Sequence, residues 1–155
     1  MEDIIMTPER ERDWAEYRKI IAGLRLMDDD FMSIAFNNDN ELTAFVLRII
    51  LEKDDLIVTK VRTQVESKSA THRSVTLDVK ATDSEGKIYN IEVQRSDRGS
   101  GVRRARYHSS ALDHELLSKG NDFDKLVDTY VIFITERDKF RRGLPMYHID
   151  RTIAE

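Results

Sequence analysis

Hydrophobic residues recur at two different periods along this chain, and the change of period separates the expected helices from the expected strands. In the first third of the chain, apolar residues recur at helical spacing. A first helix is expected after Thr7-Pro8, which is typical of a helix start. A short helix or loop is expected at residues 31–36, and a further helix over residues 42–51. The first helix would carry Trp14, Tyr17, Ile21 and Leu24 on its apolar face, and the helix over 42–51 would carry Leu42, Phe45, Val46, Ile49 and Ile50.

From residue 56 onward the pattern changes to runs rich in β-branched residues, which predict strands at residues 56–64, 74–82 and 87–94. The polar residues 66–73 predict a loop between the first two strands. The second and third strands would form a hairpin, because the polar residues 83–86 between them end in a glycine that can take a positive φ.

One helix and one strand complete the pattern. The helix is expected from about Val102 to Ser118, with Lys119-Gly120 as its C-terminal cap. Its buried face would carry Val102, Ala105, Ser109, Leu112 and Leu116. The last strand, from residue 128 or 129 to Thr135, contains an apolar run that is typical of a strand buried on both faces.

Three polar residues within the predicted hairpin carry the candidate chemistry. Asp78 lies on its first strand, and Glu92 and Gln94 lie on its second. Side chains alternate along a strand, so Glu92 and Gln94 point the same way, and the hairpin register can bring Asp78 beside them. Two carboxylates and an amide oxygen form the kind of cluster that hard cations such as Mg²⁺ favour, which predicts a metal-dependent phosphodiesterase. The competing interpretations are a loop-capping Asp78 and a solvent-facing side of the sheet.

The order Asp78 … Glu92-Val-Gln94 resembles the Asp…Glu-X-Lys signature of the PD-(D/E)XK nucleases, with glutamine in place of lysine. The resemblance extends to the branch called PD-(D/E)XK nuclease family transposases, or recombination-promoting nucleases, and covers roughly Asp28 to the C-terminus. The residues that carry it are Leu77-Asp-Val79, Gly86 to Arg95, Arg104-Ala-Arg-Tyr107, Lys119-Gly120 and Tyr130 to Thr135.

The resemblance implies an α/β fold with a restriction-endonuclease-like core of helix, three strands, helix and strand, built around a central mixed sheet. An extra helix would precede this core. Residues 1–27 would form the N-terminal helical extension, and residues 28–155 the nuclease-like domain. Similar proteins usually continue further, which suggests that the domain is truncated at its C-terminus or is a short paralogue.

The resemblance also implies how the site works. Asp78 and Glu92 would bind Mg²⁺, with Mn²⁺ as a substitute. Gln94 is neither a base nor a charged group at neutral pH, so water activation would shift from the usual lysine toward the metal.

An acidic residue from the first core helix often completes this kind of site, and Glu41 is the expected one. Asn38 and Glu41 have capping-box spacing, so Glu41 could instead satisfy a helix terminus. Asp30 is the competing candidate, and it could equally be a cap.

Charge is distributed unevenly along the chain. The net charge is −4, which argues weakly against a nucleic-acid binder. Residues 1–55, however, carry 14 acidic and 7 basic residues, whereas residues 56–155 carry 15 acidic and 18 basic residues. Arginines concentrate just after Gln94, where a DNA backbone would need neutralising, although a solvated helix face is an equal alternative. The predicted DNA-binding residues are Arg95, Arg98, Arg103, Arg104, Arg106 and Tyr107. Arg104 would contact the scissile phosphate or orient Glu92. Tyr107 would stack or form a hydrogen bond nearby, or would be an ordinary core-edge residue.

The composition excludes several other classes of protein. Cysteine is absent, so neither a disulfide framework nor a thiolate metal site can form. The four histidines, His72, His108, His114 and His148, have no metal-ligand spacing. The sequence contains neither a membrane-spanning apolar run nor a signal-peptide pattern, so the cytoplasm is the expected location.

Three functions are therefore open. The first is an Mg²⁺-dependent DNA endonuclease associated with mobile elements and recombination. The second is an inactive nuclease-fold domain that binds DNA or a protein partner. The third is a self-association module. A homodimer is open in each case, since nucleases of this fold often act in pairs.

Overall fold

The computed structural model describes residues 8–25, 27–67, 74–95 and 101–151. Two predicted features, the Thr7 cap and most of the loop at 66–73, lie outside these residues. The elements in chain order are α1 (Pro8–Gly23), α2 (Asp29–Phe36), α3 (Asn40–Leu51), β1 (Val58–Ser67), β2 (Val75–Asp83), β3 (Ile88–Gln94), α4 (Val102–Leu116), the 3-10 helix η1 (Phe123–Lys125) and β4 (Thr129–Thr135).

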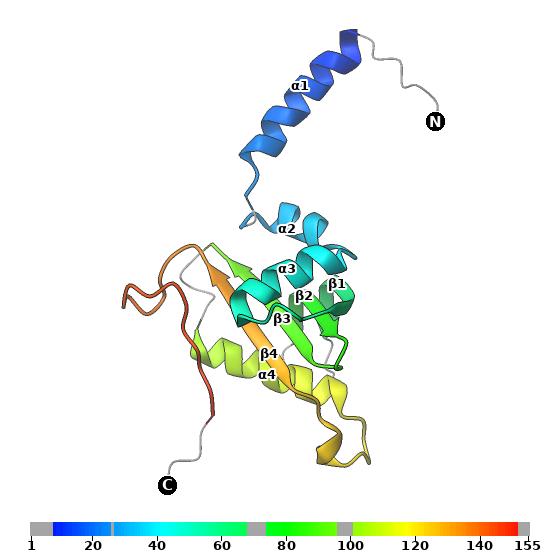
Figure 1. The fold of residues 1–155 in the computed structure, drawn as a ribbon, viewed down its shortest axis with the longest axis vertical. Helices are drawn as coiled ribbons and strands as arrows, with labels where there is room; N and C mark the ends of the chain where they lie inside the picture. The colour runs from blue at the N-terminus through cyan, green and yellow to red at the C-terminus, as the bar shows by residue number, and fades with distance from the viewer. Residues whose placement is uncertain (1–7, 26, 68–73, 96–100, 152–155) are drawn as a thin grey trace.

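The four strands form one mixed sheet in the order β1-β2-β3-β4. The β1–β2 and β2–β3 pairs are antiparallel, and β3 and β4 are parallel. Helix α4 supplies the crossover that a parallel pair requires. Helices α2 and α3 lie on one face of the sheet and α4 lies on the other (Figure 1). The predicted order of helix, three strands, helix and strand is confirmed.

The β2–β3 turn is organised by the buried carboxylate of Asp83. Its Oδ1 accepts hydrogen bonds from the amides of Glu85 (2.9 Å) and Lys87 (2.8 Å), and its Oδ2 accepts one from the Tyr89 hydroxyl (2.7 Å). Burial and the Asp83 bond raise the pKa of Tyr89 above its usual value. Gly86 has φ +85°, the left-handed conformation predicted for the turn. This turn determines which residues of the two strands face each other.

The main core lies between the sheet and α2 and α3. Its buried residues are Met32, Phe36, Ala44, Leu47, Leu56, Val58, Val61, Val79, Ala81, Tyr89, Ile91 and Val93. A smaller cluster of Leu77, Ile88 and Leu112 includes a residue of α4. Both clusters draw on β3, so the sheet is held between two layers of helices.

The strand buried on both faces is β3 and not the last strand. Six of the seven residues of β3 are buried, whereas every residue of β4 is only partly buried. The prediction for the last strand was wrong because β4 lies at the edge of the sheet, where one side has no neighbouring strand. An apolar run does not report whether its strand is central or at an edge.

Helix α3 turns only part of its predicted face toward the core, where Leu42 and Val46 pack as predicted. Thr43, Ala44 and Leu47 are buried, whereas Phe45 and Ile49 are exposed. The helix is apolar around most of its circumference, so periodicity fits more than one face. Packing against β1 selects the face that contains Ala44 and Leu47.

Helix α4 ends earlier than predicted. Its last residue is Leu116 and its C-cap is Leu117, so Gly120 does not cap it, although Gly120 does take a positive φ of 88° in the following turn. Leu112 is buried as predicted, but Val102 is exposed because it is the first residue of the helix.

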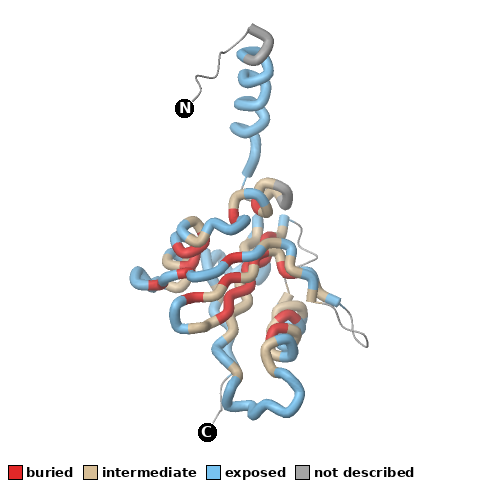
Figure 2. The backbone as a smooth tube through the Cα atoms, turned by 90° about the vertical axis from the view of Figure 1, so that its right-hand side faces the viewer, coloured by how far each residue is buried: buried red, intermediate tan, exposed pale blue. Residues whose placement is uncertain are grey.

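Helix α1 extends away from the sheet and its covering helices (Figures 1 and 2). All of its residues from Glu11 to Gly23 are exposed. Among the described residues, no helix is both long and apolar enough to cross a membrane.

We expect Asp83→Ala to lower the free energy of unfolding by about 2–3 kcal/mol, because two backbone amides and the Tyr89 hydroxyl would lose a charged acceptor. Urea unfolding measures this. Glu85→Ala, at an exposed position of the same turn, is the control and should change stability by less than about 0.5 kcal/mol. Equal losses in both variants would contradict the role given to Asp83.

Candidate active site

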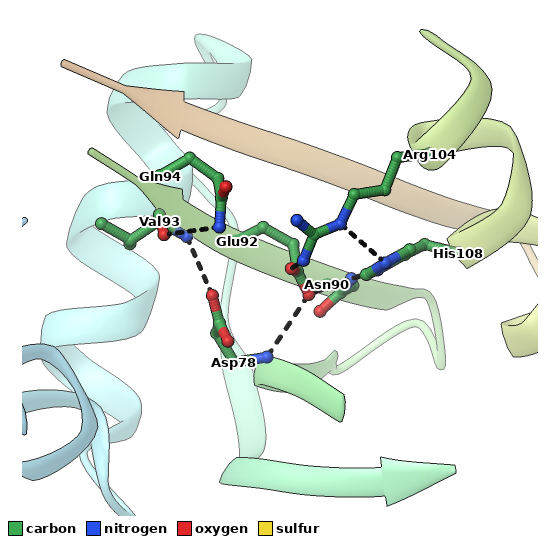
Figure 3. Close-up of polar contacts among 7 residues, drawn as sticks. All are labelled: Asp78, Asn90, Glu92, Val93, Gln94, Arg104 and His108. Carbon is green, nitrogen blue, oxygen red and sulfur yellow. Dashed lines mark hydrogen bonds and ion pairs between the residues drawn. The ribbon is translucent and has the colours of Figure 1, made fainter. Parts of the chain in front are cut away.

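Asp78 and Glu92 face each other where the β2–β3 ladder ends. The last paired residues are Val79 and Ile91, and Asp78 and Glu92 are the next residues on the two strands. The Asp78 amide donates to Glu92 Oε1 (3.4 Å), and the Val93 amide donates to Asp78 Oδ2 (3.1 Å) (Figure 3). Each carboxylate therefore binds the backbone of the opposite strand, and the predicted convergence of Asp78 with Glu92 is present.

Glu92 is 0% exposed and is held by three side chains. Its Oε2 accepts from Arg104 Nη2 (3.0 Å), and its Oε1 lies 3.0 Å from Asn90 Nδ2 and 3.3 Å from His108 Nδ1. Burial by itself raises the pKa of Glu92, but the hydrogen bonds from His108 and Asn90 and the charge of Arg104 outweigh it. The pKa of Glu92 is consequently below its ordinary value, and the buried side chain is a carboxylate at neutral pH.

His108 is buried between Arg104 and Glu92 and bonds to both. Arg104 Nε donates to His108 Nε2 (3.2 Å), so that ring nitrogen is the acceptor and the ring proton lies on Nδ1. Nδ1 then donates to Glu92, next to the Asn90 amide. Arg104 also lies over the Phe133 ring, 5.6 Å from its centroid. Arg104 and His108 are four residues apart on α4, so they project from the same side of the helix toward β3.

Gln94 and Asn90, on the same strand as Glu92, carry further side-chain oxygen atoms. Gln94 Nε2 donates to the Val93 carbonyl (3.3 Å), which leaves the Gln94 amide oxygen pointing away from that bond. Asn90 Oδ1 is the one buried side-chain polar atom of the described residues without a hydrogen-bond partner. Among the described residues, no three acidic or histidine side chains are grouped to hold a metal.

This donor set suits a divalent cation that is bound by two carboxylates and completes its shell with water, because an all-protein cage needs more ligands than are grouped among the described residues. Asp78 and Glu92 provide two carboxylates at the end of the β2–β3 ladder. The Val93 carbonyl, which accepts from Gln94, is a neutral oxygen on the same strand as Glu92.

The predicted DNA-binding residues differ in their surroundings. Arg103, Arg106 and Tyr107 are exposed on α4 and share one side of the helix. Arg104 turns inward to Glu92, but its side chain remains 38% exposed. Arg95 Nη1 pairs with Asp28 Oδ1 (2.8 Å). Arg98 lies outside the described residues.

Glu41 is exposed in the first turn of α3. The predicted cap at Asn38 is replaced by Asp39, whose side chain accepts from the Leu42 amide (2.9 Å). Asn40, next to Glu41, donates to the Thr59 carbonyl (3.1 Å), toward the Val58–Asp83 end of the β1–β2 ladder. Helix α3 therefore starts away from the position of Asp78 in that ladder, and the role given to Glu41 stays a prediction.

Helix α2 lies closer to the site. Ser33 accepts from Gln64 Nε2 (3.2 Å), and Gln64 is the β1 residue across from Asp78 in the register. Asp28, just before α2, binds Arg95 at the end of β3. The side chain of Asp30 lies outside the described part of the chain, but the backbone of its helix begins at this end of the sheet.

Three residues of this site were missed from the sequence: Asn90, His108 and Asp28. Asn90 shares the β3 face of Glu92 by strand alternation, and His108 shares the α4 face of Arg104 by helical spacing. Both signals were present in the sequence. Only packing brings Asp28 to Arg95, because 67 positions separate them.

Residues 35–155 match the model of a protein family described as PD-(D/E)XK nuclease family transposase. No curated protein and no solved structure gives a significant match. The matched segment includes the paired carboxylates and the arginine-bearing helix α4.

The stability of the protein should fall as the pH drops through the folded-state pKa of Glu92. That pKa is lowered by folding, so Glu92 stabilises the protein fully above its unfolded pKa of about 4.3 and loses this contribution as the pH decreases. Urea unfolding between neutral and acidic pH measures the effect. Glu92→Gln should lose about 1–3 kcal/mol at neutral pH and show a weaker acid dependence.

The matched control is Glu16→Gln, an exposed glutamate on α1. It should keep both the stability and the acid dependence of the wild type. An acid dependence that is unchanged in Glu92→Gln would contradict the paired, ionised Glu92.

Proposed function

Because this chain belongs to the PD-(D/E)XK nuclease family transposases, we propose that it is an endonuclease that hydrolyses DNA with Mg²⁺, or Mn²⁺ as a substitute. The observation that carries the proposal is the pairing of Asp78 with Glu92 across the open end of the β2–β3 ladder. Two carboxylates at this position could hold a cation, which would supply the charge stabilisation that phosphodiester hydrolysis requires. The family also suggests an association with mobile elements and recombination.

Asp78 and Glu92 would hold the cation, and the Val93 carbonyl would be a further donor. When bound, the cation would supply positive charge for the phosphate oxygens and would lower the pKa of water. Gln94 has no charge and cannot take a proton, so its part is limited to hydrogen bonding. It could orient water or substrate once its side chain leaves the Val93 carbonyl.

Arg104, His108 and Asn90 act as positioning residues for Glu92. Together they keep a fully buried carboxylate ionised and fixed in orientation. A cation ligand must be deprotonated, and these partners outweigh the burial that by itself would raise the pKa of Glu92, so the carboxylate stays ionised at neutral pH. Loss of such supporting hydrogen bonds typically weakens metal affinity or activity by about 10–100-fold.

The outward side of α4 is the proposed DNA contact. Arg103 and Arg106 supply exposed positive charge, and Tyr107 lies beside them. The partly exposed Arg104 joins this surface to Glu92, so a phosphate bound to the arginines would lie next to the carboxylates. Arg95 and Arg98 would extend the contact beyond the end of β3.

A third acid is more readily supplied from the start of α2 than from Glu41. Asp28 already reaches the end of β3, and Ser33 binds the residue across from Asp78. Asp30 lies between these two anchors in the sequence. Glu41 follows Asn40, whose side chain donates to the Thr59 carbonyl near the Val58–Asp83 end of the β1–β2 ladder.

One observation favours a second candidate function, an inactive domain that binds DNA or a protein. Both oxygens of Glu92 already accept hydrogen bonds from the protein, and Gln94 stands where the motif has a lysine. These groups would hold Glu92 in place without a metal. The exposed arginines of α4 serve binding in either case.

We expect nicking of plasmid DNA that requires Mg²⁺ or Mn²⁺ and falls by about 100-fold or more in Asp78→Asn and Glu92→Gln. Manganese binding measured by electron paramagnetic resonance should weaken in the same variants. Asp54→Asn, which changes an exposed acid after α3, is the matched control and should behave like the wild type.

The outcomes separate the two functions. DNA binding without nicking and without manganese binding would support the inactive domain. Nicking that persists in both site variants would mean that another protein caused it, and the proposed enzyme would be ruled out.

We also expect Asp28→Asn or Asp30→Asn to reduce nicking by about 10–100-fold, whereas Glu41→Gln should leave it near the wild-type rate. Arg95→Gln breaks the Asp28 ion pair but keeps the acid. Measuring its DNA affinity together with its nicking rate separates the loss of the ion pair from the loss of the proposed Arg95 contact with DNA. A large loss in Glu41→Gln alone would instead assign the third acid to α3.

A further inference from the structure

Helix α1 carries an apolar stripe that no described part of the chain covers. Trp14, Tyr17, Ile20, Ile21 and Leu24 are all exposed. The Trp14 and Tyr17 rings pack edge to face, with centroids 6.3 Å apart, so they lie on one side of the helix. The Leu24 amide bonds the Ile21 carbonyl (3.1 Å), which carries the stripe one step past the end of the helix. The helix itself projects away from the sheet (Figure 2).

The stripe follows the spacing of a coiled coil. Trp14, Tyr17, Ile21 and Leu24 are separated by three, four and three positions, which is the a-d-a-d pattern of two heptads. We propose that α1 is a dimerisation helix that pairs with α1 of a second copy of this chain as a parallel two-stranded coiled coil.

Charge complementarity favours a second copy in the parallel orientation. With Trp14 and Ile21 at a, Asp13 occupies a g position and Arg18 the following e position. In a parallel pair, g of one helix faces the next e of the other, so Asp13 would meet Arg18 of the second copy twice by symmetry. Antiparallel pairing sets e beside e and g beside g, so Asp13 and Arg18 would not meet.

The charge of the helix argues against other partners. Pro8–Gly23 contains four acidic and four basic residues, so α1 lacks the basic face of a helix that binds anionic membranes or nucleic acid. A balanced set of both signs around an apolar seam is typical of helix pairing. The proposal does not depend on the nuclease function, since it concerns residues outside the matched segment.

A second exposed apolar region provides the competing dimer surface and the control. Ile34 on α2 and Phe45 and Ile49 on α3 are exposed. Ile21 is 56% exposed and Ile49 is 62% exposed, so the same substitution at these two positions compares the two surfaces directly.

The first experiment is sedimentation equilibrium of the full chain over a range of concentrations, with Ile21→Arg and Ile49→Arg. We expect a concentration-dependent dimer whose dissociation constant rises by about 100-fold or more in Ile21→Arg, because a charge would be placed in the apolar seam. Ile49→Arg should dimerise like the wild type. Urea unfolding of each variant shows that the sheet remains folded.

The second experiment reverses the charges. Asp13→Arg and Arg18→Asp should each weaken the dimer by about three- to tenfold, and the double variant should restore it, since the opposite pair reforms. Because the chain has no cysteine, Trp14→Cys and Leu24→Cys can then be oxidised separately. Efficient self-crosslinking at both ends of the stripe is expected only for parallel, in-register helices.

A wild type that stays monomeric at high micromolar concentration would overturn the proposal. So would a dimer that is lost in Ile49→Arg and kept in Ile21→Arg, which would assign the interface to α2 and α3. A charge-reversed double variant that is weaker than both single variants would overturn the parallel arrangement.

Discussion

The organisation of this protein depends on one buried charge, the carboxylate of Glu92. A charged group without solvent is tolerated only when other groups satisfy it. Arg104 and His108 of α4 do so from one side and Asn90 of the same strand from another. The requirement therefore attaches α4 to the centre of the sheet in a defined rotation. Because Arg104 and His108 must face Glu92, the side of α4 that carries Arg103 and Arg106 remains exposed.

The second constraint is the register of the β2–β3 hairpin. The Asp83 carboxylate holds the turn. The turn sets the register of the two strands and so places Asp78, five residues before Asp83 on β2, opposite Glu92. Where the ladder stops, Asp78 binds the Val93 amide that would otherwise pair with β2. The hydrogen bonds that replace strand pairing at this point thus also hold the two carboxylates in the opening between the strands. The buried Asp83 at the turn therefore affects the positions of Asp78 and Glu92 at the other end of the hairpin.

The same contacts that orient Glu92 also limit what it can do. Its oxygens accept bonds from Arg104 and Asn90, so a cation must share the carboxylate with them through its remaining lone pairs. Asp78 is the other acid beside the opening. The proposed site therefore depends on two carboxylates in different surroundings. Glu92 is held by side chains of β3 and α4, and Asp78 accepts a hydrogen bond from the Val93 amide.

The sequence alone determined the order of elements, the hairpin and the pairing of Asp78 with Glu92, because strand alternation and turn chemistry act over a few residues. Tertiary structure decided which face of α3 is buried, that β4 is an edge strand, and that Asp28 reaches Arg95. It also gave His108 its place beside Glu92. These features join residues far apart in the chain, and local periodicity carries no information about which distant surface will cover a helix or strand.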